Sequence, residues 1–296
     1  MIFNVNKRKV LSVFMLFFCF QFVTAQLTDL ARLEYSFIPK SNSDDNYTRL
    51  RLLFNYPIKV KENTYFIFGA EYNRIILNLE DDYPFNTSLL ETINVIDVNV
   101  GYTFKTNKKW RLGVKLNPRI ASTLKQKITI DDFFINGGVY AIQDRTKDES
   151  LKKPYRLILG LTYNASLGVP FPLPLINYYR RVNDKWSFSA GVPKSNIKHY
   201  FNKKNTVQAF VSLDGYFAHL QSPALVIGKQ VKNISLSVAV FGTGYEYCFT
   251  KHLVAYAYAG YTFRLNNVLR DKTRNVVYKL DDKNAFYFRS GLKFKL

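Results

Sequence analysis

The sequence predicts an all-β protein, specifically a transmembrane antiparallel up-and-down β-barrel, and three observations support this. The chain has 25 Phe and 21 Tyr but only 2 Trp in 296 residues, and such side chains favour strands. From Leu30 onward, segments of about ten residues alternate apolar and polar positions between turns, and helical spacing explains none of them. The last twelve residues, AFYFRSGLKFKL, end the chain with a strand that is apolar on one face and basic on the other.

The N-terminus predicts a cleavable secretory signal at residues 1–25. Asn6 to Lys9 forms a basic region, Val10 to Phe22 an apolar region, and Val23 to Ala25 a small-residue cleavage site. The apolar region is shorter than the ~20 residues that a spanning helix needs. We therefore expect one mature domain, residues 26–296. It keeps only Cys248, so an internal disulfide is not expected.

The best segments sort their residues at a period of two. At residues 49–56, leucines and aromatics oppose Arg49, Arg51 and Asn55. In residues 110–120, Leu112, Val114 and Leu116 form one face. The same sorting recurs at residues 94–105, 253–266 and 286–296, where the apolar faces include Ile96, Val98, Phe263, Phe286 and Phe288 and the polar faces include Asp97, Asn99, Arg264, Arg289 and Lys293.

The turns are of two kinds, and they orient the predicted barrel. Short, Lys-rich turns lie at residues 59–63, 106–109, 182–185, 202–205 and 250–252, while longer acidic loops surround residues 44–45, 80–82, 131–132 and 281–282. Barrels of this kind have short periplasmic turns and longer external loops. This rule places the C-terminus in the periplasm. It gives 12 strands if residues 186–201 fold inward, and 14 if both halves of that element join the wall.

Two local features interrupt the alternation. Between Phe241 and Tyr245 the apolar positions change from even to odd, which predicts a bulge eased by Gly242 and Gly244. Pro170, Pro172 and Pro174 cannot donate ladder hydrogen bonds, which predicts a rim or an interrupted strand.

Alternation alone does not show whether the apolar face meets lipid or a core. A barrel of about 8 strands is just filled by side chains, whereas a wider one leaves a lumen that they cannot fill. With 12 or more strands, the apolar face should point outward to lipid. Two stacked soluble sheets are the alternative, although strands of 11 to 13 residues are long for a sandwich.

The polar faces predict the side chains of the lumen. The proposed solute-binding residues are Arg49, Arg51, Arg111, Lys115, Arg119, Arg156, Arg264 and Arg289. They are accompanied by many tyrosines and by a smaller number of acids, including Glu34, Glu71, Asp97 and Asp214. Excess positive charge in a pore selects anions, so we expect a porin-like channel for small, preferably anionic solutes. The alternative is a closed structural, adhesive or envelope-modifying barrel, in which the bases pair with acids and hold the lumen shut.

The sequence does not favour an enzyme, a cofactor or a metal site. Of the three histidines, only His219 lies near Asp214 and Ser222, which leaves a lipid-acting hydrolase as a lesser hypothesis. The acidic loop pairs could hold a divalent cation, but such pairs are more often solvated loop charge. The net charge of +20 is spread over the strands rather than gathered on a helix or tail, so a nucleic-acid partner is not expected.

The signal ending in Thr24-Ala25-Gln26, the strands rich in Tyr, Phe, Asn and Lys, and the closing Phe294-Lys295-Leu296 resemble the uncharacterised outer-membrane β-barrel proteins common in Bacteroidota. The resemblance covers almost all of the mature chain and implies a fold and an outer-membrane location. It carries over no catalytic or binding residue. The expected partners are outer-membrane lipid, lipopolysaccharide and the barrel-assembly machinery, which would engage the C-terminal strand.

Overall fold

The computed structural model describes residues 29–41, 43–165 and 170–295, so the predicted signal peptide lies outside the described residues. Its strands are β1 (Asp29–Ile38), β2 (Asn46–Lys61), β3 (Thr64–Asn78), β4 (Thr92–Lys105), β5 (Trp110–Ser122), β6 (Phe133–Asp144), β7 (Tyr155–Asn164), β8 (Phe171–Arg181), β9 (Trp186–Val192), β10 (Lys194–Tyr200), β11 (Asn205–Val226), β12 (Lys229–Cys248), β13 (Leu253–Arg270), β14 (Val276–Lys279) and β15 (Phe286–Lys295). Two single-turn 3-10 helices, η1 (Thr87–Leu89) and η2 (Ile130–Asp132), lie in the connections. Among these residues, no helix is both long enough and apolar enough to cross a bilayer.

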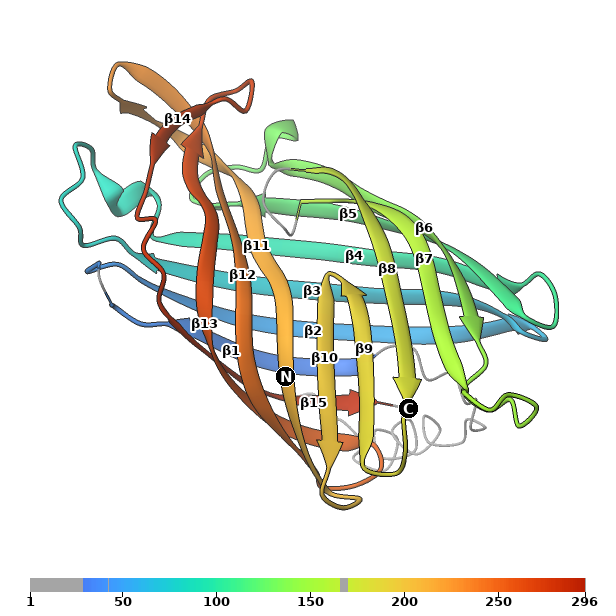
Figure 1. Ribbon diagram of the computed structural model, residues 1–296. Helices are drawn as coiled ribbons and strands as arrows, with labels where there is room; N and C mark the ends of the chain where they lie inside the picture. The colour runs from blue at the N-terminus through green and yellow to red at the C-terminus, as the bar shows by residue number, and fades with distance from the viewer. Residues whose placement is uncertain (1–28, 42, 166–169, 296) are drawn as a thin grey trace, which may run out of the picture.

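Within the described ranges, fourteen strands form a closed antiparallel ring (Figure 1). Strands β1 to β13 pair in chain order, and β15 closes the ring by pairing with both β13 and β1. The short β14 pairs only with the end of β13 and stays outside the ring. The predicted fold class is confirmed, and the count is fourteen rather than twelve. The twelve-strand count is wrong because β9 pairs with β8 and β10 with β11, so both halves of the hairpin belong to the wall.

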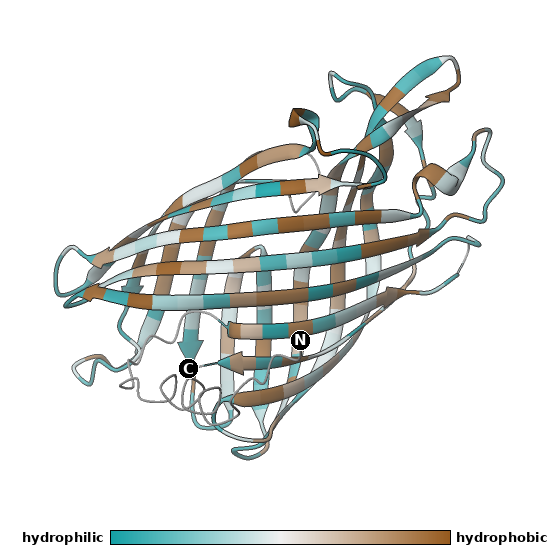
Figure 2. Cartoon of the chain, turned by 180° about the vertical axis from the view of Figure 1, so that it is seen from behind, coloured by the Kyte–Doolittle hydropathy of each residue, from teal (hydrophilic) through white to brown (hydrophobic). Residues whose placement is uncertain are grey.

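The predicted sidedness of the wall is confirmed. Leu112, Val114 and Leu116 are 38 to 50% exposed on the outer surface, whereas Asn117 and Arg119 on the other face are buried. Phe286 and Phe288 of β15 are likewise exposed, and Tyr287 between them is 2% exposed. Figure 2 shows the resulting alternation of hydrophobic and hydrophilic residues along the strands. The dry centre that two stacked soluble sheets would need does not form from these residues.

The two ends of the barrel differ in their connections. One end, here called the turn end, carries the short turns, both ends of the described chain and the ten-residue connection between β6 and β7. The opposite end, the loop end, carries the acidic connections, β14 and the tall hairpin of β11 and β12. Sorting into short basic turns and longer acidic loops therefore holds in three dimensions.

At the loop end the ring is narrower, because β11 reaches across to β5. His219 of β11 pairs in parallel with Ser122 of β5, and Gln221 Nε2 donates to Asp132 Oδ2 at 2.9 Å. Phe217 of β11 packs edge-to-face on Phe134 of β6, with ring centroids 5.5 Å apart. The β5–β11 contact thus bounds a ring of nine strands (β1 to β5, β11 to β13 and β15) within the described residues.

A ring of nine strands is close to the size that side chains can fill, and apolar residues fill this one. Ile75, Ile93, Leu220 and Ile234 belong to a buried cluster contributed by opposite walls, and each is at most 1% exposed. The sequence predicted polar inward faces and left open whether the lumen is open or shut; at the loop end the inward faces are apolar and the lumen is closed. The lumen is polar only toward the turn end, where all fourteen strands surround it.

The same core explains why the predicted bulge at residues 241–245 is absent. Strand β12 pairs with β11 in one continuous register from Ile234 to Tyr247. The even apolar residues of β12, such as Ile234 and Val240, face the internal core, while Phe241 and Tyr245 are exposed outside. The apolar phase therefore changes because two different surfaces follow each other along one regular strand. A register shift occurs instead between Ser237 and Val238, against β13.

Candidate functional site

The turn-end half of the lumen holds a cavity of about 960 Å³, here called the vestibule. Eight basic and two acidic side chains line it in the described structure, an excess of six positive charges. The bases are Arg32, Arg51, Lys115, Lys147, Arg156, Arg181, Lys251 and Lys295, and the acids are Asp29 and Glu71. Lys147 comes from the long β6–β7 connection, so this turn-end loop contributes directly to the cavity wall.

At least five bases of the vestibule make no salt bridge among the described residues, namely Lys115, Lys147, Arg156, Arg181 and Lys295. Two of these lie on neighbouring parts of the strand wall. Among the described residues, Lys115 of β5 makes neither a hydrogen bond nor a salt bridge, and its side chain is exposed to the lumen. The guanidinium of Arg156 on β7 lies 5.3 Å from the ring centroid of Tyr179 on β8, and its Nε has no hydrogen-bond partner in the described structure. These two groups are therefore available to an anion that enters the cavity.

A second cavity of about 420 Å³, here called the side cavity, adjoins the vestibule. The two share Arg51, Glu71, Asn99, Lys115 and Tyr140 in their walls. The side cavity is bordered on the other side by β7, β8, Pro193 and Leu213. It thus extends from the polar centre of the barrel to one part of the wall.

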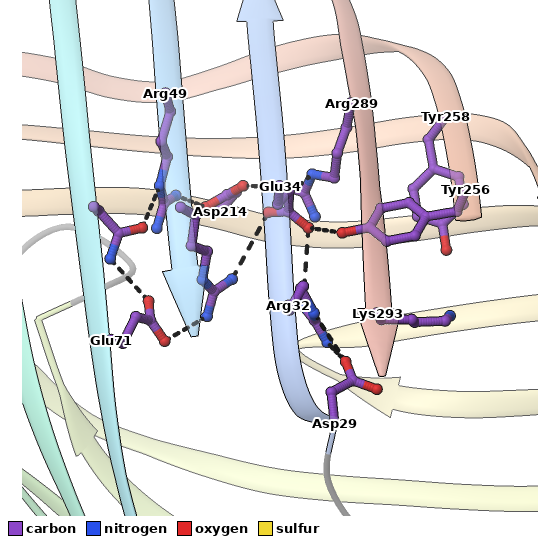
Figure 3. A network of polar contacts seen from close by, with 12 residues as sticks. Asp29, Arg32, Glu34, Arg49, Glu71, Asp214, Tyr256, Tyr258, Arg289 and Lys293 are labelled. Carbon is purple, nitrogen blue, oxygen red and sulfur yellow. Dashed lines mark hydrogen bonds and ion pairs between the residues drawn. The ribbon is translucent and has the colours of Figure 1, made fainter. Parts of the chain in front are cut away.

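Above these cavities, a network of ion pairs joins opposite walls of the barrel (Figure 3). Glu34 of β1 is 2% exposed, accepts a hydrogen bond of 2.7 Å from Tyr256 Oη and lies 3.7 Å from Arg289 Nε. Asp214 of β11 pairs with Arg289 and, at 2.9 Å, with Arg49 of β2. Because β2 and β11 are not neighbours in the ring, the Arg49–Asp214 pair crosses the lumen and helps close it.

Other acids in the lumen are similarly satisfied. Arg119 donates two hydrogen bonds to Asp97, at 2.7 and 2.8 Å, and Arg51 pairs with Glu71 at 2.8 Å. Glu246 of β12 accepts from Lys198 and Lys293 at 3.0 and 3.1 Å. The lumen acids are consequently neutralised by partners, which leaves the vestibule bases in excess.

The structure brings most of the predicted lumen residues together, but not all of them. Arg51 and Lys115 line both cavities, Arg156 lines the vestibule, and Arg49 and Arg119 line the side cavity. Arg111 lies at the turn end, where Nη1 donates to Asn63 O at 2.9 Å. Arg289 belongs to the crossing network, and Arg264 is paired with Asp281 at 2.7 Å at the loop end. The last two therefore stabilise the closed part and line neither the vestibule nor the side cavity.

Sequence reasoning did not include several vestibule bases, namely Arg32, Lys147, Arg181, Lys251 and Lys295. Arg32 and Arg181 lie in strands that were not assigned faces, and Lys147 and Lys251 lie in connections. Lys295 lies on the basic face predicted for the last strand but was not named as a solute-binding residue. A register for β1 and β8 would have found Arg32 and Arg181, since both alternate with residues of the outer surface.

The hydrolase hypothesis is not supported by the geometry. His219 is buried in the β5–β11 contact, Asp214 is engaged by arginines, and Ser222 Oγ accepts from Gln126 Nε2 at 3.1 Å. No hydrogen bond joins these three residues to one another in the described part of the chain. Over the same ranges, no group of His, Cys, Asp or Glu is arranged to hold a metal ion.

The acidic loops contact one another through Tyr83. Its phenol donates to Asp45, and its oxygen accepts from the Asp281 backbone N–H at 3.3 Å. Burial, and then the hydrogen bond to Asp45, raise the pKa of the Tyr83 phenol. The phenol therefore stays protonated and holds the β3–β4 connection against the loop before β15.

No curated protein matches this sequence. Among solved structures, the fold is similar to that of "KdgM porin", with 11% identity, 90% of this chain and 99% of that chain covered and a TM-score of 0.38. It is also similar to "LpxR from Salmonella typhimurium", with 7% identity, 90% and 100% coverage and a TM-score of 0.41. The third is the "TodX deltaS2S3 mutant monoaromatic hydrocarbon channel", with 10% identity, 90% and 88% coverage and a TM-score of 0.39. Residues 23–295 match the family described as "Domain of unknown function (DUF6268)", and the chain belongs to this family.

Proposed function

We propose that this protein is an outer-membrane barrel that takes anionic solutes into its vestibule and passes them across the membrane. The observation that carries the proposal is the excess of basic over acidic side chains, eight against two, around a cavity of about 960 Å³. Lys115 and Arg156 supply cations without acidic partners in the described structure, so a solute anion need not displace an internal one. Rings of such side chains favour anions over cations in pores.

A membrane location is supported by the outer surface of the wall. Leucine, valine and phenylalanine side chains are exposed on strands all around the ring, including Leu33, Leu52, Val98, Leu161, Phe263 and Leu292. Lipid would cover this apolar surface, and ring closure pairs the backbone groups of most of the wall. We place the turn end in the periplasm, because short turns occupy that side in barrels of this kind.

The apolar core and the crossing ion pairs close the axial path at the loop end. We therefore expect small, gated currents rather than those of a wide-open porin. The same core favours one competing function, a closed barrel with a structural role in the envelope. The two functions differ in whether folded protein moves ions at all.

The test is the reversal potential in planar bilayers that separate unequal KCl concentrations. Wild type should prefer chloride over potassium, and Lys115→Gln with Arg156→Gln should reduce that preference. Arg111→Gln is the matched control, since Arg111 lies outside both cavities and should leave selectivity unchanged. Cation preference, or no effect of the double substitution, would contradict the proposal. Absence of current from correctly folded protein would favour the closed barrel.

A further inference from the structure

One sector of the barrel wall stops short of the loop end. Strands β9 and β10 have only seven residues each and are joined at Pro193, whereas β8 has 11 residues and β11 has 22 (Figure 1). The last backbone contact at the hairpin tip is from Leu213 N to Pro193 O, at 2.9 Å. Beyond this tip, β8 and β11 continue toward the loop end without the hairpin between them.

The two flanking strands consequently have backbone edges without a ladder partner. Among the described residues, Phe171 to Leu175 of β8 pair only with β7, because pairing with β9 begins at Ile176. Gly215 to Ala218 of β11 pair only with β12 in the described structure. Five residues of strand span about 17 Å at 3.4 Å per residue, so the interruption is large on the scale of a bilayer.

The composition of the β8 edge fits a permanent opening. Unpaired backbone N–H groups are costly in lipid, and proline has none to leave unpaired. Pro172 and Pro174 both lie in the five-residue edge of β8. The predicted interrupted strand is thus a real strand whose free edge carries the prolines.

On the other side, β11 is held away from β8. Its upper part is attached to β5 through His219 and Ser122, and Gln221 donates to Asp132 beside β6. At the bend, a Cβ on Gly215 would lie 2.1 Å from Leu236 O, so glycine is required for this close approach to β12. The contacts that narrow the loop end therefore also separate β11 from β8.

The side cavity reaches this interruption from inside. Its wall includes Leu173 and Leu175 on the β8 edge, Pro193 at the hairpin tip and Leu213 at the start of the free β11 edge. Leu173 and Leu175 pair with Thr162 and Gly160, on the wall face that also carries Tyr179 of the vestibule. An apolar lining thus meets the polar lumen at the place where the wall is interrupted.

We propose that single-chain amphiphiles with an anionic head group pass sideways between β8 and β11, with the head group at Lys115 and the chain against Leu173, Leu175 and Leu213. This inference rests on the proposed function, because the amphiphile would enter through the same basic vestibule. Lys115 lines both cavities and has no salt-bridge partner among the described residues, so it is placed to hold a carboxylate or phosphate. The lateral path bypasses the apolar core.

The experiment uses the full mature chain in lipid nanodiscs and dodecanoate that carries a diazirine at its chain end. After photolysis, peptide mass spectrometry should locate the label on residues 171–175 and 213–217. Leu173→Trp with Leu213→Trp should reduce this labelling about tenfold, equivalent to the loss of 1.4 kcal/mol of binding. Ile176→Trp with Val211→Trp is the matched control on the same two strands, since both residues face outward and line neither cavity. The control should label like wild type.

A dodecanol probe with the same diazirine separates lumenal binding from contact with bulk lipid. It lacks the anionic head group and should label the two edges weakly, whereas Lys115→Gln should weaken dodecanoate labelling to a similar extent. Equal labelling by both probes, or labelling that the tryptophans do not change, would overturn the lateral route. Chloride preference of wild type is measured in parallel. If wild type prefers chloride but is not labelled at the two edges, the lateral route is wrong and the anion vestibule stands, whereas absence of chloride preference from wild type would count against the proposed function.

Discussion

Tyr47 of β2 and Tyr216 of β11 stack across the lumen, with ring centroids 6.2 Å apart and ring planes 8° from parallel. Their strands are not neighbours in the ring, and both rings are at most 8% exposed. Two residues further toward the turn end on each strand, Arg49 and Asp214 form the next contact between the same two strands. The stack and the ion pair together set the place where the polar lumen gives way to the core.

Removing the stack should open the axial path. Tyr47→Ala with Tyr216→Ala removes apolar contacts between the two walls, and large-to-small changes of buried aromatics cost about 3 to 5 kcal/mol each. We expect more frequent and larger current steps in planar bilayers. Tyr261→Ala, on the outer surface, is the control and should conduct like wild type. Unchanged currents from a folded double variant would show that the closure lies elsewhere.

The wall should tolerate charge according to face. Leu116 is 50% exposed on the outer surface, and arginine there should cost about 2 to 4 kcal/mol near the bilayer midplane. Lys115 faces the lumen, so Lys115→Arg keeps its charge in water and should leave stability nearly unchanged. Urea titrations of folding into lipid vesicles measure both. Equal stability of the two variants would contradict the lipid-facing assignment.

Breaking a buried ion pair should cost far more than breaking an exposed one. Asp97→Asn leaves the buried Arg119 guanidinium without its carboxylate, and such losses cost about 3 to 5 kcal/mol. Asp148 pairs with Arg145 in the β6–β7 connection, where solvent screens the charges. Asp148→Asn should therefore leave the unfolding midpoint unchanged. Similar midpoints for the two variants would argue against a dry Arg119–Asp97 pair.

The Tyr83 contact predicts a pH dependence of the loop-end connections. Burial raises the pKa of the Tyr83 phenol above its ordinary value of 10.0, so the folded loops bind a proton that the unfolded chain releases first. Loop stability is then constant through neutral pH and falls as pH rises above about 10. Proteolysis of the β3–β4 connection across pH measures this.

In that experiment, Tyr83→Phe distinguishes the contribution of the Tyr83 hydroxyl from that of its aromatic ring. The variant keeps the ring contacts with Phe85 and Tyr278 but loses the hydrogen bond to Asp45, which should increase cleavage at neutral pH and flatten the alkaline dependence. Tyr278→Phe is the control, since the Tyr278 hydroxyl makes no hydrogen bond among the described residues. Identical cleavage of the two variants would contradict the role of the Tyr83 hydroxyl.

The alternation of apolar and polar residues predicted the outer face of the barrel, because every strand must place apolar side chains on the face that meets lipid. Leu116 and Phe288 could thus be assigned to the outside without knowledge of their neighbours. The inner face meets two different environments, since Ile234 of β12 packs in an apolar core while Glu246 of the same strand pairs with lysines in the polar lumen. Which environment an inward residue meets depends on the contact between β11 and β5, which joins His219 and Ser122, 97 positions apart in the sequence. The sequence pattern of β12 alone therefore suggested a bulge that does not exist.

The candidate site was predictable in part for the same reason. Arg51, Lys115 and Arg156 were placed in the lumen by strand periodicity, and they do line the vestibule. Lys147 and Lys251 lie in connections, whose direction periodicity does not determine. The three prolines at residues 170–174 indicated an interruption of the wall, but the side cavity behind it depends on the length of a different element, the β9–β10 hairpin.

The contact between His219 and Ser122 divides the barrel wall into two parts, here called the frame (β1 to β5, β11 to β13 and β15) and the panel (β6 to β10). Nine strands of the frame enclose the hydrophobic interior, and the remaining five, β6 to β10, complete only the wider half. We expect insertions, deletions or new side chains in strands β7 to β10 of this panel to reshape the vestibule and the side cavity with little effect on the hydrophobic interior. The shape of the polar cavities and most of the stability of the core thus depend on separate parts of one polypeptide.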